Sequence, residues 1–316
     1  MLSRRLLRVK VMQAVYAYHK NEEINLQQAE KNLFHSISKS FELYHLYLLL
    51  FIEIKCYAEK RIEIGRNKKI PLPEELNPNT RFINNMVLCQ LAENSYLQRF
   101  VEQTGLSWSN YPEIIKAVYQ QVIGSELYAG YMASNEESYE GDRKFIVKLA
   151  EKVIAQYEPL YSNIEEQSIF WNDESEFVIN MAIKTLREYR QQNGAEQPLL
   201  PEFKDDDDRE FAKRLFRKAI MNHTELSELV KKLSKNWELE RIAFMDIVLM
   251  DIALAEMMEF STIALKVTIN EYIEIAKHYS TPKSGTFING LLEKIITEYI
   301  EQGKIKKIGD ELLKLN

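Results

Sequence analysis

The segment "SGTFINGLLEKIITEY", residues 284–299, shows the pattern that decides the fold. Its apolar side chains recur every three or four residues, at Ile288, Leu291, Leu292, Ile295, Ile296 and Tyr299. At about 3.6 residues per turn these positions form one stripe along an α-helix. The same spacing recurs along almost the whole chain, and alternating apolar and polar runs are rare. The sequence therefore predicts an all-α protein.

The composition is that of an ordinary globular protein. Of the 316 residues, 46% are hydrophobic and 28% are charged. A chain of this length can bury at least one sizeable core, and we expect two. Ten Gly and eight Pro are few for the length, so tight turns are scarce and long helices are expected.

The cysteines and the apolar runs indicate an intracellular protein. Cys56 and Cys89 lie in apolar helical patterns without CxxC or Cys/His spacing, which predicts buried, reduced thiols. Arg8 and Lys10 interrupt the apolar core that a signal peptide needs. The longest apolar run, residues 46–52, is far shorter than the roughly 18 residues of a membrane span. We expect a cytoplasmic protein with no membrane partner.

Two loops divide the helical pattern into three parts. The first loop, "GRNKKIPLPEELNPNT", spans residues 65–80, and the second, "QQNGAEQPLLPEFKDDDD", spans residues 191–208. Both contain the Gly, Pro and Asn residues that interrupt helices. They predict N-terminal helices over residues 1–64, an inserted helical module over 65–201 and C-terminal helices over 202–316.

The spacing also predicts individual helices. A long helix is expected over about residues 33–64. Five more are expected after the second loop, over residues 210–223, 225–234, 239–259, 263–279 and 284–303. We interpret the acidic run Asp205–Asp208 as a cap for the first of these five, rather than as a cation site.

Positive charge is concentrated at the start of the chain. The segment "SRRLLRVKVMQAVYAYHK", residues 3–20, carries five basic side chains and no acidic one, although the net charge is −6, so the remainder sums to −11. This helix is apolar on two sides, so its body is core and only its first turns can project. The basic side chains there are Arg4, Arg5, Arg8 and Lys10. Such a cluster fits nucleic-acid binding and is also common as a solvated helix end.

The start of the final helix is a second candidate site. Phe287 falls about 100° from the centre of the apolar stripe, in the first turn beside Lys283 and Ser284. Free N–H groups, a positive helix end, a lysine and an aromatic ring suit a phosphate with a stacked base. The alternative is that Phe287 packs against the preceding loop as a hydrophobic staple.

The sequence carries no catalytic motif. It has no Gly-rich nucleotide loop, no HExxH, no GxSxG and no zinc-type Cys/His spacing. The histidines are scattered along the chain, without paired carboxylates at metal-ligand spacing, at His19, His35, His45, His223 and His278. We therefore expect no enzyme, no cofactor and no metal site.

Two segments of the C-terminal part are distinctive: "KVTINEYIEIAKHYST", residues 266–281, and "FINGLL", residues 287–292. They resemble the family of the transcription antitermination factor NusB. Residues 3–18 look like the basic first helix of that family, and "DREFAKRLFRKAI", residues 208–220, resembles the helix that opens its second half. The resemblance implies a NusB-like helical bundle built of two small helical subdomains, in a long form with a large internal insertion.

The resemblance also implies a function. Members of the family bind the boxA element of ribosomal RNA transcripts with NusE, a ribosomal small-subunit protein, in the transcription elongation complex. Carried over by position, the RNA contacts would come from Arg4, Arg5, Arg8, Lys10, Lys283, Ser284 and Phe287. Asp246 matches an acidic position on the NusE-facing surface, whereas Asp251 stands where the family usually has an arginine.

Two other classes of protein are alternatives. A non-catalytic helical scaffold would bind a protein partner through the inserted module, and its basic end would be incidental. An RNA-modifying enzyme with a NusB-like domain would need a Rossmann-type domain with a Gly-rich loop after a strand, and this sequence has neither. Binding of a boxA-like RNA at moderate salt separates the antitermination factor from the scaffold.

Overall fold

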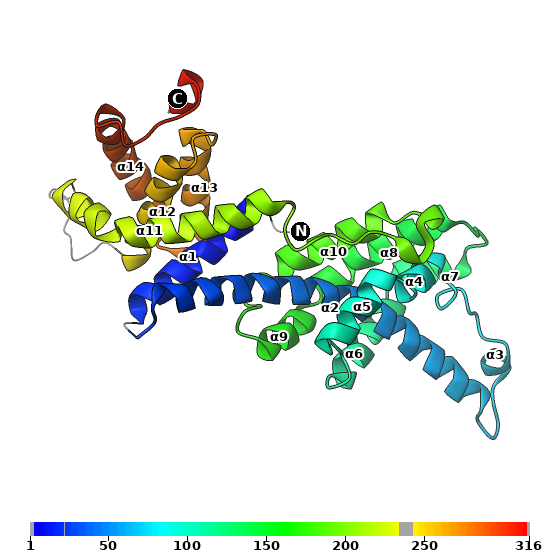
Figure 1. Cartoon of the computed structure of the whole chain (residues 1–316). Coiled ribbons are helices and arrows are strands. Elements are labelled where there is room, and N and C mark those ends of the chain that lie inside the picture. The colour runs from blue at the N-terminus through cyan, green and yellow to red at the C-terminus, as the bar shows by residue number, and fades with distance from the viewer. Residues whose placement is uncertain (1–2, 22, 234–242, 315–316) are drawn as a thin grey trace. The chain divides into compact units, whose positions relative to one another are not determined.

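The computed structural model describes residues 3–21, 23–233 and 243–314. These residues form α-helices, short 3-10 helices and turns, with no β-strand among them (Figure 1). The prediction of an all-α protein is confirmed. The chain divides into two compact units, which we call the terminal unit (Leu2–Ile37 with Phe203–Asn316) and the middle unit (Ser38–Glu202).

The terminal unit brings the two ends of the sequence into one bundle. Helix α1 (Arg4–Lys20) packs against α11 (Asp206–Leu233) and α12 (Phe244–Glu259). The bundle is completed by α13 (Leu265–Tyr279), α14 (Ser284–Glu301) and the short η4 (Asp310–Leu313). Every side chain from Val248 to Met257 is buried, because the sequence of α12 is apolar on nearly all sides. Helix α12 is therefore the central helix of this unit.

The middle unit is organised around the longest helix. Helix α2 (Leu26–Arg66) begins in the terminal unit, and from residue 38 onward it belongs to the middle unit. Trp108 is buried in this core, and its indole N–H donates to the carbonyl of Leu46 on α2 at 2.9 Å. The remaining helices of the unit are α3 (Pro73–Leu76), α4 (Met86–Ala92), α5 (Ser95–Thr104), α6 (Pro112–Ile123), α7 (Glu126–Ala133), α8 (Tyr139–Lys152), η1 (Ile154–Gln156), α9 (Glu158–Gln167), α10 (Ser175–Glu188) and η2 (Gln191–Glu196).

The predicted helices agree with the structure in kind and differ at their ends. The helix predicted over residues 33–64 is α2, which starts about two turns earlier. The two helices predicted over 210–223 and 225–234 are continuous in α11, because no Gly or Pro separates them. Residues 239–242, where the next predicted helix begins, lie outside the described residues.

The compact units do not divide the chain where the loops suggest. The loop signal places the first boundary after residue 64, whereas the units separate between residues 37 and 38, inside α2. A helix that changes its packing partners midway needs no Gly or Pro at that point, so the sequence carries no signal there. The second boundary, after residue 202, lies in the predicted loop. Whether residues 65–201 are an insertion relative to the family stays a prediction.

The acidic run before α11 has the predicted capping role. A carboxylate oxygen of Asp205 accepts the backbone N–H of Asp208 at 3.0 Å, which satisfies one of the free donors at the start of the helix. The three residues that follow Asp205 are aspartates in the first turn, where negative charge complements the helix dipole.

The structure also shows the surroundings of the two cysteines and whether any described helix could cross a membrane. Cys56 and Cys89 are unpaired, but each is only partly buried, so the prediction that both thiols are buried is wrong. Burial raises the pKa of both thiols. None of the described helices is long and apolar enough to cross a membrane.

Candidate nucleic-acid interface

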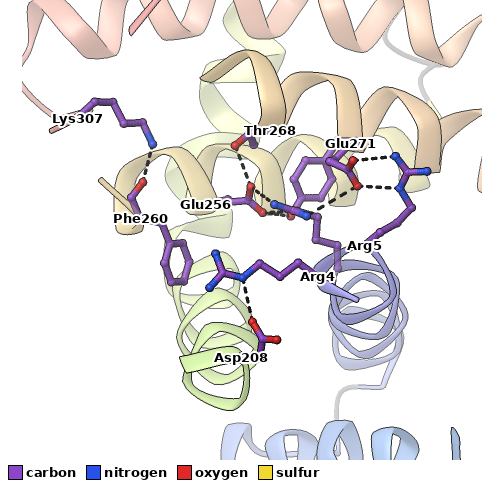
Figure 2. A network of polar contacts seen from close by, with 10 residues as sticks. Arg4, Arg5, Asp208, Glu256, Phe260, Thr268, Glu271 and Lys307 are labelled. Carbon is purple, nitrogen blue, oxygen red and sulfur yellow. Dashed lines mark hydrogen bonds and ion pairs between the residues drawn. The ribbon is translucent and has the colours of Figure 1, made fainter. Parts of the chain in front are cut away.

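The first turn of α1 exposes two arginines, each paired with a distant carboxylate. Arg4 donates from Nε to Asp208 at the start of α11 at 3.0 Å. Arg5 makes a two-pronged contact with Glu271 of α13, at 2.8 and 2.7 Å, and this contact lowers the pKa of Glu271 (Figure 2). The side chains of Arg4 and Arg5 are 44% and 57% exposed, so both guanidinium groups reach solvent.

Arg8, one turn further along α1, lies inside the bundle. Its guanidinium group donates two hydrogen bonds to Glu256 of α12, at 2.7 and 2.8 Å, and its side chain is 4% exposed. Glu256 also accepts hydrogen bonds from the hydroxyl groups of Thr268 at 2.8 Å and Tyr272 at 3.0 Å. Burial opposes the charge on Arg8, but the hydrogen bonds and the charge of Glu256 outweigh it and raise the pKa of Arg8. Arg8 and Glu256 are therefore a buried, hydrogen-bonded ion pair in the core of the bundle.

The four basic residues of α1 do not form one exposed cluster. Lys10 is 1% exposed and Arg8 is 4% exposed, so the expectation that both side chains project from the helix end is wrong. The reason is that α1 packs against both α11 and α12, so every side chain from Leu6 to Met12 is buried. Of these four residues, Arg4 and Arg5 are exposed to solvent and can contact a ligand at the surface.

The turn between α13 and α14 is held by a chain of hydrogen-bonded hydroxyl groups, of which Ser284 is buried. Ser284 is 1% exposed, and its Oγ donates to Ser280 Oγ at 3.0 Å and accepts the backbone N–H of Thr281 at 3.1 Å. Ser280 in turn donates to a carboxylate oxygen of Asp246 at 2.6 Å. Asp246 is 4% exposed, so the expectation of a partner-facing surface carboxylate is wrong in this structure. Its buried carboxylate stabilises the turn through the hydrogen bond from Ser280.

This contact gives a testable stability effect. Replacing Asp246 by Ala removes a buried carboxylate and leaves the partly buried hydroxyl group of Ser280 without its acceptor. We expect the free energy of unfolding to fall by about 1–3 kcal/mol, the cost of an unsatisfied buried polar group. Thermal and urea unfolding measure the change. The exposed Asp206, in the first turn of α11, supplies a control, because Asp206→Ala should cost less than half as much; equal losses would contradict the role of Asp246.

Phe287 is buried on the inner side of α14. Its side chain is 9% exposed, in a helix whose buried residues run from Ser284 to Tyr299. Helix α14 contacts α11, α12 and α13, so its buried arc is wider than the apolar stripe that the sequence suggests. The expected exposed stacking ring is therefore not present. Of the predicted residues in this turn, Lys283 alone is exposed, at the start of α14.

The carboxylates that pair with the arginines of α1 were not predicted from the sequence. Glu256 is 248 positions from Arg8, so no local spacing could pair them. The available signal was an acidic residue in the middle of "IALAEMM", residues 252–258, where a buried carboxylate requires a cation or several donors. That signal predicts a buried partner but cannot say which of the many basic residues supplies it.

Together these features define a class of protein: a helical bundle that fixes a basic first helix with internal ion pairs and exposes two arginines at its start. The NusB family model matches residues 179–297. The transcription antitermination protein NusB of Salinibacter ruber is 40% identical over 137 residues, which cover 42% of this chain and 86% of the relative. The corresponding protein of Dictyoglomus turgidum is 41% identical over 97 residues, covering 31% of this chain and 67% of the relative.

The chain therefore belongs to the NusB family. A solved structure of T. maritima NusB is 31% identical, covers 39% of this chain and 87% of that chain, and has a TM-score of 0.30. The family match begins at residue 179, inside the module predicted over residues 65–201, and does not include α1. The relation of α1 to the family's first helix stays a prediction.

Proposed function

We propose that this protein is a transcription antitermination factor that binds boxA-type RNA of ribosomal transcripts together with the ribosomal small-subunit protein NusE, in the cytoplasm and without catalysis or an organic cofactor. The similarity to the Salinibacter ruber protein carries this proposal, because it extends over 86% of a relative that is named a transcription antitermination protein. The exposed arginines at the start of α1 supply a surface of the right charge.

The RNA surface is proposed to use the exposed basic side chains. These are Arg4 and Arg5 at the start of α1 and Lys283 at the start of α14. Both arginines already face carboxylates, so a phosphate would compete with Asp208 and Glu271 for their donors. For Arg5 such competition costs little, because ion pairs at the surface contribute only about 0–1 kcal/mol. For Arg4 it costs more, because the carboxylate of Asp208 is buried.

The buried residues of the predicted set are proposed to act indirectly. Arg8 and Lys10 hold α1 in the bundle, and Asp246 and Ser284 fix the turn that presents Lys283. A change at any of them should weaken RNA binding only as far as it displaces the exposed residues. The proposed RNA contacts of the exposed residues and the proposed support from the buried ones can therefore be tested separately.

Salt titration tests the contact residues. Each phosphate contact on a single strand contributes about 0.7 to the slope of log affinity against log salt, so Arg4→Ala with Arg5→Ala should flatten that slope by about 1.4. The effect should be the same for boxA-type RNA and for an unrelated RNA of equal length, because phosphate contacts carry no sequence information. Fluorescence anisotropy across a series of salt concentrations measures both slopes.

The middle unit provides the matched control. Lys116 and Lys144 have side chains 56% and 67% exposed, so Lys116→Ala with Lys144→Ala removes the same charge at a distant part of the sequence. The control variant should keep the slope of the unmodified protein. An unchanged slope in the arginine variant would remove the start of α1 from the RNA surface. A protein that binds NusE but no RNA would favour the helical scaffold instead.

A further inference from the structure

Three side chains from three different helices of the terminal unit lie close together at the C-terminal end of α1. His19 lies in the last turn of α1, His223 in α11 and Asp251 in α12. Each offers one atom able to bind a metal ion, and these atoms all lie within 4.8 Å of one another. The two imidazole rings face each other with centroids 3.8 Å apart, and Nδ1 of His223 contacts the Asp251 carboxylate.

Two of these side chains have polar atoms that the described residues leave unsatisfied. Nε2 of His19 and Oδ1 of Asp251 are buried, and neither has a hydrogen-bond partner in the part of the chain that the structure describes. Asp251 is 0% exposed, so water does not reach its carboxylate from the surface. Buried polar atoms are almost always paired, and each exception needs an explanation. A cation between the three side chains would satisfy both atoms at once.

We propose that His19, His223 and Asp251 bind one Zn²⁺ ion. Two imidazole nitrogens and one carboxylate oxygen are a ligand set that zinc takes in proteins, with a water in the fourth position. Ca²⁺ and Mg²⁺ prefer oxygen ligands, so a site with two imidazoles selects against them. Ligand atoms of a tetrahedral zinc site lie about 3.4 Å apart, so no pair has to close by more than about 1.4 Å. The contact between Nδ1 of His223 and the Asp251 carboxylate has to lengthen if both of its atoms bind the ion.

The site would have a structural role in the bundle. Zinc bound here joins the end of α1 directly to α11 and α12, the two helices against which α1 packs. At the other end of α1 the Arg8 contact with Glu256 joins the same helix to α12. The sequence could not indicate this site, because His19 and His223 are separated by about two thirds of the chain and neither belongs to a ligand motif.

Metal titration of the full-length, tag-free protein tests the proposal. After dialysis against a chelator, Zn²⁺ should bind in a ratio of one per chain in calorimetry, and it should raise the melting temperature. Co²⁺ in its place should give the visible absorption of a four-coordinate site without a thiolate band. His19→Ala and Asp251→Asn should each weaken Zn²⁺ binding by 100-fold or more, and circular dichroism would confirm that both variants remain helical.

An exposed histidine of the same unit is the control. His278 lies near the end of α13, and His278→Ala should leave the affinity and the stoichiometry unchanged. Should His19→Ala fail to fold, His19→Gln keeps a polar side chain of similar size and should show the same loss of binding. The proposal is overturned if the unmodified protein binds no stoichiometric Zn²⁺, if His278→Ala weakens binding as much as Asp251→Asn, or if folded His19 and Asp251 variants bind normally.

Discussion

Replacing Arg8 by Met is expected to lower the free energy of unfolding by about 3–5 kcal/mol, because it leaves the buried carboxylate of Glu256 without its cation. Arg8 is 4% exposed and Glu256 is 0% exposed, so water cannot replace the lost contact. Arg5→Met is the matched control, since Arg5 makes the same two-pronged contact with Glu271 at the surface. That change should cost about 0–1 kcal/mol. Urea unfolding followed by circular dichroism measures both.

A double variant separates the ion pair from the packing around it. Arg8→Met with Glu256→Leu removes both charges, and such replacements are often close to neutral when the pair is isolated. In the double variant the hydroxyl groups of Thr268 and Tyr272 lose their acceptor, Glu256. We therefore expect it to regain only part of the free energy of unfolding that Arg8→Met loses. The double variant should therefore lie between Arg8→Met and the unmodified protein. A loss for Arg8→Met no greater than that for Arg5→Met would show that the core does not depend on this pair.

The helices could be predicted because their cause is local. Apolar spacing and the lack of Gly and Pro are properties of short segments, so the spacing predicted both ends of α13 and α14 and the C-terminal end of α2 to within two residues. It missed the first turns of α2. Capping is local too, and the role of Asp205 was predictable for that reason. The division into units was not, because α2 continues through the boundary and its change of neighbours depends on the tertiary structure.

The candidate site depends on contacts that no local pattern contains. The sequence shows that α1 begins with basic residues, but whether an arginine is exposed depends on which helices cover it. Arg5 and Arg8 are three positions apart on the same helix, and their side chains are 57% and 4% exposed. The difference arises from α12, which places Glu256 beside Arg8. The convergence of His19, His223 and Asp251 is likewise a product of the packing.

Phe287→Ala is expected to reduce the free energy of unfolding by about 3–5 kcal/mol, the usual cost of truncating a buried phenylalanine. The ring is 9% exposed, at the start of a helix that contacts three others. RNA affinity per folded molecule should change little. An exposed ring that stacked on a base would behave in the opposite way, with about 1–3 kcal/mol lost from binding and stability nearly unchanged. Thermal melts paired with RNA titration below the melting temperature distinguish the two.

Two further variants make the result decisive. Phe287→Leu keeps an apolar side chain in the core but removes the aromatic ring, so packing predicts a loss of only about 1–1.5 kcal/mol and normal RNA binding. If the ring stacks on a base, Phe287→Leu should bind RNA as poorly as Phe287→Ala, because neither variant has an aromatic ring at this position. Val267→Ala, on α13 at a position 49% exposed, controls for loss of an apolar group at the surface and should change stability by no more than about 0.5 kcal/mol. If Phe287→Leu is stable but binds RNA poorly, the ring meets RNA despite its burial, and the turn between α13 and α14 must open when RNA binds.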